Sequence, residues 1–248
     1  TLDSCTIISN TLYEEALGEH YEGAVHICRQ PFGQELQLLC RDKQITQLWF
    51  EGRSLSAAQF LHLKQVSKVP LVQSGDLVER MRERKDREEI QLLQQACAIT
   101  DAALVAVFKC LQVGMSEQEV AWMVERQIRE LGSEDISFRP LIVAAGKHSA
   151  EPHHLPSEYR IATGDMVQFD IGARFQGYAA DLSRVACAGA PGQEQLQVYQ
   201  LVRRVQQFAI ESITVGCQGA EIDRRCKEMI EKEGYAPYAH GLGHGVGL

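Results

Sequence analysis

Apolar residues recur at helical spacing over the middle of the chain. From about Asp86 a period near 3.6 residues predicts a long helix, with Gly114 as its C-terminal cap. A second helix is expected from a capping box formed by Ser116 and Glu119 to a stop at Gly132. The apolar positions of these two helices are Ile90, Leu93, Cys97, Thr100, Leu104, Val107, Leu111, Val120, Val124, Ile128 and Leu131.

The same pattern returns later in the chain. Two more helices are predicted over residues 194–215 and 221–233. The offset that aligns Gly114 with Gly216 also aligns the capping and core positions of both helices, which predicts an internal duplication. The apolar positions expected to face inward in the later pair are Leu196, Tyr199, Val202, Val205, Ala209, Ile210, Ile213, Ile222, Cys226, Met229 and Ile230.

The first part of the chain has a different pattern, in which short apolar runs alternate with a helix-like stretch at 56–66. This alternation predicts a small α/β unit over residues 1–80, followed by a second domain over 81–248. The mixed charges of residues 79–89 are typical of a solvated linker and helix start. The short apolar runs are Cys5–Ile8, Ala24–Cys28, Leu36–Cys40 and Ile45–Phe50.

Composition narrows the class of protein. The 248 residues carry 25 Lys and Arg against 33 Asp and Glu, a net charge of −8, which disfavours nucleic acid as a partner. A hydrophobic fraction of 45% favours a folded globular chain over a disordered one. No uninterrupted apolar run approaches the roughly 18 residues of a membrane helix, so no membrane association is expected.

The eight cysteines form no CxxC pair and are spread along the chain. This spacing favours reduced thiols in a cytoplasmic protein, and a few disulfides in a secreted enzyme are the alternative. Cys97, Cys110 and Cys226 fall within helical patterns and are expected in the core.

Two aspartates lie in a predicted β-hairpin over residues 166–185. With the turn centred between Phe175 and Gln176, Asp170 would oppose Asp181 directly, with Cβ atoms about 5 Å apart. Facing like charges destabilise a hairpin unless one carboxyl protonates, Arg184 intervenes or a cation binds between them. A solvent-facing pair without a role is the alternative, and a one-residue register slip would separate the two side chains.

Histidines flank this hairpin in the sequence, at positions 148, 153, 154, 240 and 244. His240 and His244 lie four residues apart among glycines, which would allow a backbone to approach a ligand closely. Two carboxylates and one imidazole suit a first-row divalent metal, of which Mn is expected and Co or Zn are alternatives.

Four motifs together resemble one known family. They are Ser149-Ala-Glu-Pro-His-His-Leu-Pro156, Gly164-Asp-Met-Val-Gln-Phe-Asp-Ile-Gly172, Gly177-Tyr-Ala-Ala-Asp-Leu-Ser-Arg184 and His240-Gly-Leu-Gly-His-Gly-Val-Gly247. The set resembles the pita-bread metallopeptidases, and within them the Xaa-Pro aminopeptidase and Xaa-Pro dipeptidase (prolidase) branch. The resemblance implies an α+β pita-bread fold with internal duplication, incomplete at the C-terminus and preceded by part of a small α/β domain.

The resemblance also implies a site. Two divalent ions would be held by two Asp, one His and two Glu, with Asp170, Asp181 and His244 as the matching ligands. His153 and His240 match substrate-side histidines of the family, and His153 would donate to the developing oxyanion or the leaving nitrogen. His154 has no role in this scheme. The substrate would be a peptide with proline in second position, hydrolysed by metal-activated water, and a homodimer is compatible with this branch.

The two Glu ligands have no match in this sequence. Both the family pattern and the duplication predict them on a second hairpin beyond Leu248, so the site is expected to be incomplete and metal binding weak or absent. The main alternative function is a metal-free pita-bread module that binds peptides or proteins. Creatinase-like hydrolysis is disfavoured because the metal-ligand positions are present, and methionine aminopeptidases do not have a region like 1–78.

Overall fold

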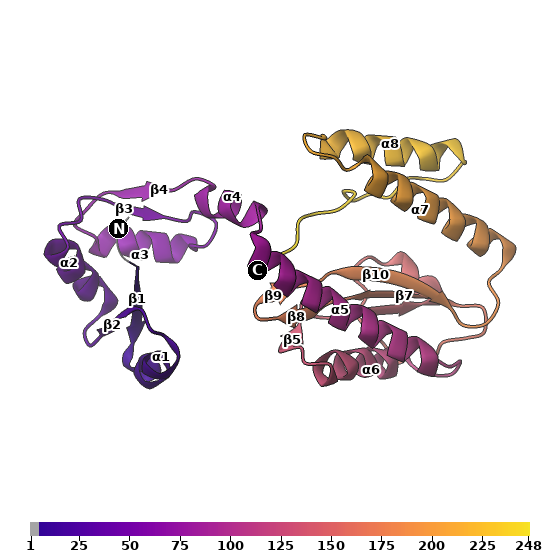
Figure 1. The fold of residues 1–248 in the computed structure, drawn as a ribbon, viewed down its shortest axis with the longest axis horizontal. Helices are drawn as coiled ribbons and strands as arrows, with labels where there is room; N and C mark the ends of the chain where they lie inside the picture. The colour runs from indigo at the N-terminus through magenta and orange to yellow at the C-terminus, as the bar shows by residue number, and fades with distance from the viewer. Residues whose placement is uncertain (1–4) are drawn as a thin grey trace. The chain divides into compact units, whose positions relative to one another are not determined.

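The computed structural model describes residues 5–248, and the chain divides into two compact units, Thr1–Met81 and Arg82–Leu248 (Figure 1). The boundary predicted after residue 80 lies next to this division. The interpretation of the two units as parts of larger domains stays a prediction.

The first unit consists of short parallel strand pairs with helical connections. Strand β1 pairs with β2, and β3 pairs with β4, both in parallel, so each pair needs a crossover. The crossover helix α3 begins at a capping box of Ser56 and Gln59, as the helix-like stretch predicted. The apolar run Leu36–Cys40 lies within α2. The elements are β1 (Thr6–Asn10), η1 (Thr11–Tyr13), α1 (Glu14–His20), β2 (Ala24–Cys28), α2 (Phe32–Asp42), β3 (Leu48–Phe50), α3 (Ala57–Val66), β4 (Leu71–Gln73) and α4 (Leu77–Glu83), the last of which crosses the division.

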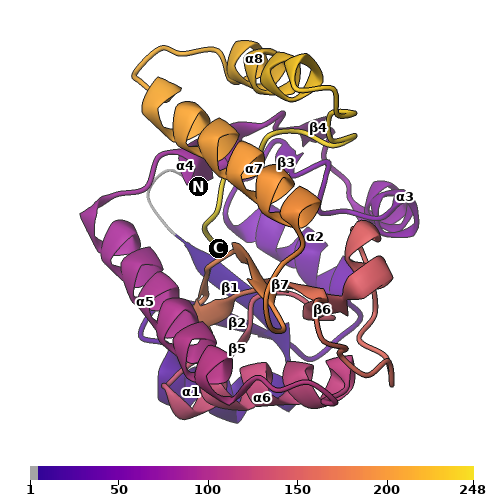
Figure 2. The same cartoon turned by 90° about the vertical axis from the view of Figure 1, so that its right-hand side faces the viewer.

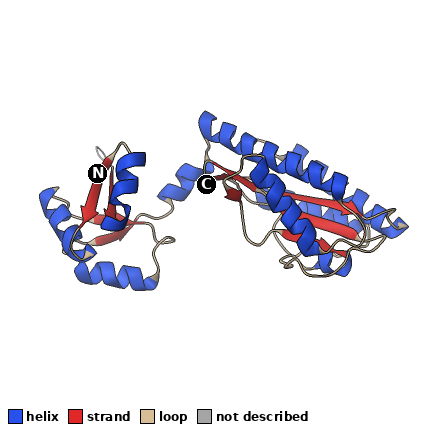
Figure 3. Cartoon of the chain, turned by 90° about the horizontal axis from the view of Figure 1, so that it is seen from below, coloured by secondary structure: helices blue, strands red, loops and turns tan. Residues whose placement is uncertain are grey.

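The second unit combines four long helices with two small antiparallel sheets. One sheet has the order β10-β7-β6 and the other β5-β8-β9. Figure 3 shows these strands in red alongside the long helices. The elements are α5 (Arg87–Cys110), α6 (Glu117–Glu130), β5 (Asp135–Ile136), β6 (Ile142–Ala145), η2 (Gly146–Ala150), β7 (Met166–Ile171), β8 (Ala173–Phe175), β9 (Tyr178–Ala179), β10 (Leu182–Cys187), α7 (Gln193–Ser212) and α8 (Gly219–Lys232).

Local sequence signals account for the first helix pair. Asp86 caps α5 through a capping box with Glu89, and Ser116 caps α6 through one with Glu119. Gly132, at φ 98°, follows α6 in the left-handed conformation that glycine favours. The C-terminal cap predicted at Gly114 was wrong, because α5 already ends at Cys110 and the extended residue Leu111 breaks the helix.

The main core forms where α5 and α6 pack against the sheet. Strand β7 alternates buried and partly exposed positions, so Val167, Phe169 and Ile171 point into the core while Gln168 and Asp170 point to the other face. Phe169 is fully buried, and its ring meets Phe108 of α5 edge-on at a centroid distance of 5.2 Å. The packing therefore fixes which face of β7 presents its polar side chains.

A glycine allows the chain to pass from one sheet to the other. Gly172 lies between β7 and β8, and a Cβ atom there would lie 1.9 Å from the carbonyl oxygen of Ala180 and 2.1 Å from Oγ of Ser137. Because the amide of Ala180 donates to the carbonyl of Ala173 across the same gap, the two segments are held in close contact. Only a residue without a side chain fits between them.

Helices α7 and α8 form a second, smaller core, visible in Figure 2 as a separate pair. The predicted duplication is visible in this pair, since Gly114 and Gly216 both take positive φ, at 92° and 86°. The buried positions correspond as well. Ile222, Cys226 and Ile230 of α8 take the places that Val120, Val124 and Ile128 take in α6.

Several predicted core positions are instead exposed. Cys97 and Cys110 lie on the exposed side of α5, whereas Cys226 is buried as expected. On α7 the predicted inward face was too wide, because a helix packed on one partner buries only the stripe facing it. Leu201, Val205 and Ala209 form this stripe, and the exposed apolar residues are Leu196, Tyr199, Val202, Ile210 and Ile213.

Helix α5 is the one helix of residues 5–248 with the length and apolar composition to cross a membrane, with a mean hydropathy of 1.4 over 18 residues. The core helix of a soluble protein meets the same criterion. In α5 the residues that face inward, among them Ile99, Ala103 and Val107, pack into the main core.

Candidate functional site

The two aspartates of the predicted hairpin lie on one face of the sheet, but not directly opposite each other. In the observed register Asp170 on β7 pairs with Ser183 on β10, and Asp181 lies two residues before Ser183. The predicted register was wrong because the turn falls at Gln176-Gly177, where both residues have positive φ, 47° and 85°. The shift keeps the side-chain alternation, so Asp181 becomes the diagonal neighbour of Asp170 on the same face.

The surroundings of Asp170 disfavour its negative charge. Burial raises the pKa of this carboxyl, and the nearby charge of Asp181 raises it further. Two partners act in the opposite direction. The hydroxyl of Ser183 donates to Oδ1 of Asp170 at 3.0 Å, and His153 lies close enough for its charge to lower the pKa. A cation between the carboxylates would remove the remaining repulsion.

A pocket of about 320 Å³ contains both carboxylates and His153. The loop after β6 supplies His153, and the segment before β6 supplies an aromatic and aliphatic wall. The pocket therefore places acidic groups and an imidazole beside apolar surface, a combination common in ligand sites. Its lining residues are Phe138, Arg139, Pro140, Ile142, His153, Asp170 and Asp181.

His244 reaches this site from the far end of the chain. Its Nε2 atom lies 3.2 Å from Oδ2 of Asp181, while its Nδ1 atom contacts the carbonyl of Gly245 at 2.9 Å. The segment is held in place by the amide of Ala179 on β9, which donates to the carbonyl of Gly247 at 2.8 Å. One ring nitrogen thus contacts the backbone, as the non-ligating nitrogen of a metal-bound histidine commonly does, and the other is turned toward Asp181.

His240 is not brought to the aspartates. Its ring stacks on Tyr238 at a centroid distance of 4.8 Å, and its Nδ1 atom contacts the carbonyl of Gly241 at 2.6 Å. It lines a separate groove between α7 and α8, which His244 also borders. The substrate-side role inferred for His240 from the family resemblance stays a prediction.

A second polar cluster surrounds Glu117, which the sequence-based interpretation did not single out. Its carboxylate is fully buried and accepts hydrogen bonds from four other residues. Oε1 accepts from the amide of Ala145 (2.8 Å) and Nδ1 of His148 (2.9 Å). Oε2 accepts from Nε2 of His154 (2.8 Å) and from the amide and hydroxyl of Ser157 (3.0 and 2.6 Å). One signal could have identified it, since Glu117 shares the helical stripe of the buried residues of α6.

These contacts determine the charges in the cluster. Burial alone would raise the pKa of Glu117, but the hydrogen bonds from Ser157, Ala145 and the two histidines lower it to about 2. Burial acts to lower the pKa of His154, yet its bonds to Glu117 and Glu151 raise it overall. The ligand-type atoms of Glu117, His148 and His154 lie within 4.8 Å of one another, a spacing that could also hold a metal ion.

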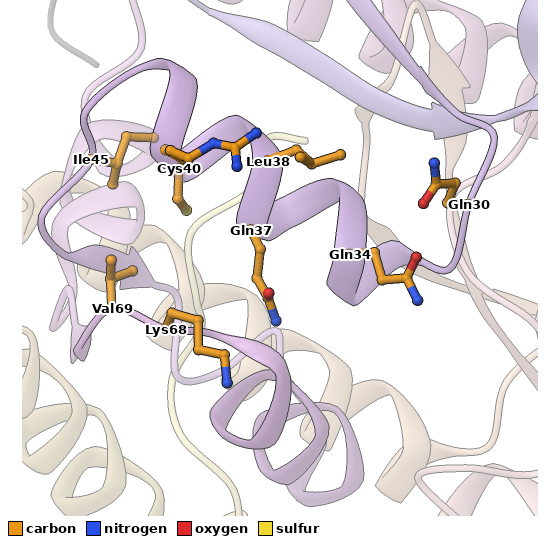
Figure 4. A pocket seen from close by; sticks show the side chains of 9 residues that line it. Gln30, Gln34, Gln37, Leu38, Cys40, Ile45, Lys68 and Val69 are labelled. Atoms are coloured by element: carbon orange, nitrogen blue, oxygen red, sulfur yellow. The ribbon is translucent and has the colours of Figure 1, made fainter.

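Another pocket lies in the first unit and contains none of the predicted site residues (Figure 4). It has a volume of about 470 Å³ and borders helix α2 and the loop before β4. Three glutamines, Arg41 and Lys68 give it an amide and cationic lining, without a carboxylate or imidazole. Its composition offers no ligand set for a divalent metal.

The donor set around Asp181 fits a divalent metal. Two carboxylates share one face of the sheet, and an imidazole nitrogen points toward one of them, which is the mixed oxygen and nitrogen set that first-row metals accept. The arrangement combines this set with the exposed imidazole of His153. It could therefore support hydrolysis by metal-activated water with a nearby proton donor.

Comparisons with known proteins agree with this chemistry. Residues 91–248 match the metallopeptidase family M24. The chain is 36% identical over 208 residues to the Xaa-Pro dipeptidase of Pyrococcus furiosus, covering 83% of this chain and 59% of that protein. The chain thus spans about three fifths of the length of this curated relative, and 52% of a similar Xaa-Pro dipeptidase from Pyrococcus horikoshii.

Solved structures show the same relationship. An Xaa-Pro dipeptidase from Bacillus anthracis superimposes with a TM-score of 0.90 at 31% identity, covering 97% of this chain and 68% of that one. An X-Pro aminopeptidase from Thermotoga maritima gives the same TM-score at 29% identity, with coverages of 99% and 70%. The fold is therefore the pita-bread fold over the part that this chain contains. The chain belongs to metallopeptidase family M24.

Proposed function

We propose that this chain carries part of the active site of a metal-dependent peptidase that cleaves the bond between an N-terminal residue and proline. The observation that carries the proposal is the gathering of Asp170, Asp181 and His244 beside His153. Relatives named Xaa-Pro dipeptidase and X-Pro aminopeptidase support the substrate class. Cleavage of dipeptides and of longer peptides are both compatible with this site.

In this proposal Asp170, Asp181 and His244 are metal ligands. Two divalent ions are expected, with Mn as the first choice and Co or Zn as alternatives. When bound, such ions lower the pKa of a shared water and polarise the scissile carbonyl. The expected Glu ligands would complete the set.

The protein groups would then bind and orient the peptide. His153 is exposed at the pocket and would donate a hydrogen bond to the developing oxyanion or to the leaving proline nitrogen. Phe138 and Ile142 line the same pocket and offer apolar surface to a proline ring. His240 would act on the substrate side only if its segment moves toward the aspartates.

The remaining expectations concern the cellular setting. All eight cysteines are free thiols, which supports a reducing compartment such as the cytoplasm. A homodimer is proposed from the family resemblance alone. The net charge of −8 disfavours nucleic acid as a partner.

The test is a peptidase assay with Mn or Co on a protein that contains this chain and the expected Glu ligands. An Xaa-Pro dipeptide, a longer Xaa-Pro peptide and a Met peptide without proline would be compared. Asp181→Asn should abolish cleavage, whereas Asp101→Asn, the same charge change on the exposed side of α5, should leave it unchanged. Binding of proline peptides without cleavage or metal would instead favour the metal-free binding module.

A further inference from the structure

The loop that carries His153 places two adjacent histidines in opposite environments. His153 is exposed and lines the pocket with Asp170 and Asp181. His154 is 9% exposed and points inward to Glu117. The two histidines are adjacent at a tight turn, in which the amide of His154 donates to the carbonyl of Glu151 at 3.2 Å. Anchoring His154 therefore also restricts where His153 points.

Glu117 holds this loop at four points. Its oxygens accept from the amide of Ala145 at the end of β6, from His148 in η2, from His154, and from Ser157. The anchored positions enclose His153 from both sides along the chain. The carboxylate belongs to the first turn of α6, whose inner face is packed into the main core, so the anchor itself is rigid.

Aromatic packing closes the cluster further. The rings of His148 and His154 stack at a centroid distance of 4.4 Å, and Tyr159 meets His148 edge-on at 4.9 Å. The hydroxyl of Tyr159 donates in turn to Asp165 at 3.0 Å. The loop therefore has little freedom around the buried ring of His154 and the partly buried ring of His148.

The hydrogen bonds also argue against a metal at this cluster. The five hydrogen bonds to Glu117 occupy about as many acceptor positions as a carboxylate offers. Both ring nitrogens of His154 lie at hydrogen-bonding distance from carboxylates, those of Glu117 and Glu151, so both are placed to donate rather than to offer a lone pair to a metal. A metal ion would have to displace these donors.

We propose that Glu117 is a positioning residue, which anchors the loop 145–157 so that His153 is aimed at the pocket containing Asp170 and Asp181. The proposal rests on the peptidase function proposed above. Glu117 itself touches neither the pocket nor the reacting atoms. It acts through the orientation of His153, and loss of the anchor would leave the substrate-binding surface largely intact.

A double-mutant cycle tests this mechanism in the active enzyme. Glu117→Gln should lower kcat for an Xaa-Pro peptide by about tenfold or more, with KM changed by less than about threefold. In a His153→Ala background the same substitution should have little further effect on kcat, because the group it positions is gone. An equal fractional loss in both backgrounds would mean general damage to the fold and would overturn the proposal.

Two further variants distinguish the positioning role from general misfolding. Ser157→Ala removes the shortest of the five hydrogen bonds to Glu117, together with the bond from the amide of Tyr159, and should lower kcat by a smaller factor. Glu119→Gln is the matched control, because Glu119 lies in the same helical turn, caps the amide of Ser116 and does not touch the loop. An effect of Glu119→Gln as large as that of Glu117→Gln would contradict the proposal.

Hydrogen exchange separates this inference from the peptidase proposal. In Glu117→Gln the amides of residues 145–157 should exchange about tenfold faster, while those of β7 and α5 stay protected. This measurement needs no activity, so failure to cleave any peptide would refute the peptidase function alone. The positioning role would be overturned if hydrogen exchange in the loop were unchanged in Glu117→Gln. It would also be overturned if the protein bound an equivalent of Mn or Zn that only the substitution of Glu117 removed.

Discussion

The Nε2 atom of His244 lies 3.2 Å from Oδ2 of Asp181, although helices α7 and α8 separate the two residues in the sequence. Asp170 and Asp181 are brought together by one hairpin, whereas His244 arrives on a glycine-rich segment without regular secondary structure. The placement of the three proposed ligands therefore depends on two structural features, the register of the hairpin and the docking of the C-terminal segment.

The first prediction concerns metal affinity. We expect the 248-residue chain to bind Mn or Co weakly or not at all, because it offers Asp170, Asp181 and His244 but not the two Glu ligands of the family. Calorimetric titration of the chain measures this directly. Tight uptake of two ions would contradict the prediction, and His244→Ala should abolish any weak binding that is seen.

The second prediction concerns the bond from Ser183 to Asp170. A hydrogen bond to a carboxylate stabilises its charged form, so Ser183→Ala should raise the already elevated pKa of Asp170 further. The titration of the carboxyl carbon of Asp170 by NMR, in metal-free protein, reports the change. Thr at position 183 keeps the hydroxyl and should preserve the wild-type pKa, and a pKa lowered in Ser183→Ala would refute the assignment.

The third prediction concerns acid stability. The pKa of Glu117 is lowered from 4.5 to about 2 in the folded state, so its ionised form stabilises the fold above about pH 4.5. This contribution, on the order of 3 kcal/mol, is lost as the pH falls from about 4.5 toward 2. In urea unfolding between pH 2 and 6, the free energy of unfolding should therefore fall more steeply with decreasing pH for the wild type than for Glu117→Gln. Parallel stability curves for the wild type and Glu117→Gln would contradict the prediction. Glu119→Gln, which changes an exposed neighbour, should follow the wild-type curve.

The fourth prediction concerns the crossing between the sheets. Gly172→Ala would place a methyl group 1.9 Å from the carbonyl oxygen of Ala180, so the two segments must separate. We expect the free energy of unfolding to fall by about 3 kcal/mol or more. Gly219→Ala is the control, since a Cβ atom there would meet nothing within 4 Å outside its own helical turn, and it should change stability by less than about 1 kcal/mol.

The helices of the second unit were predictable because their signals are local. The capping boxes at Asp86 and Ser116, and the glycine after α6, lie within a few residues of the helix ends that they determine. Burial was predicted less well, because the periodicity of apolar residues identifies one face of a helix but does not tell how much of that face a neighbouring element covers. Cys97 and the outer residues of α7 show this limit.

The site was predictable only in part. Placing the turn one residue too early gave the wrong partner for Asp170, because Gln176 gives no sequence signal for the positive φ that it adopts. The prediction that Asp170 and Asp181 share one face of the hairpin was still right, because a shift of two residues in strand pairing leaves each side chain on the same face. The helical stripe of α6 could have indicated that Glu117 is buried, but its proposed positioning role was not predictable, because its partners lie between Ala145 and Ser157.

We expect the three proposed metal ligands to come together only when the longest loop between them has closed. The hairpin of Asp170 and Asp181 needs only a short connection, and it can form early on the main core. His244 joins when the segment around Gly247 reaches the amide of Ala179, after α7 and α8 have been placed. We therefore expect refolding chains to pass through a stage in which the carboxylate pair exists without its imidazole. In a protein that also contains the expected Glu ligands, metal capture would then be a late kinetic event, and its rate would report the docking of residues 240–248 rather than the folding of the core.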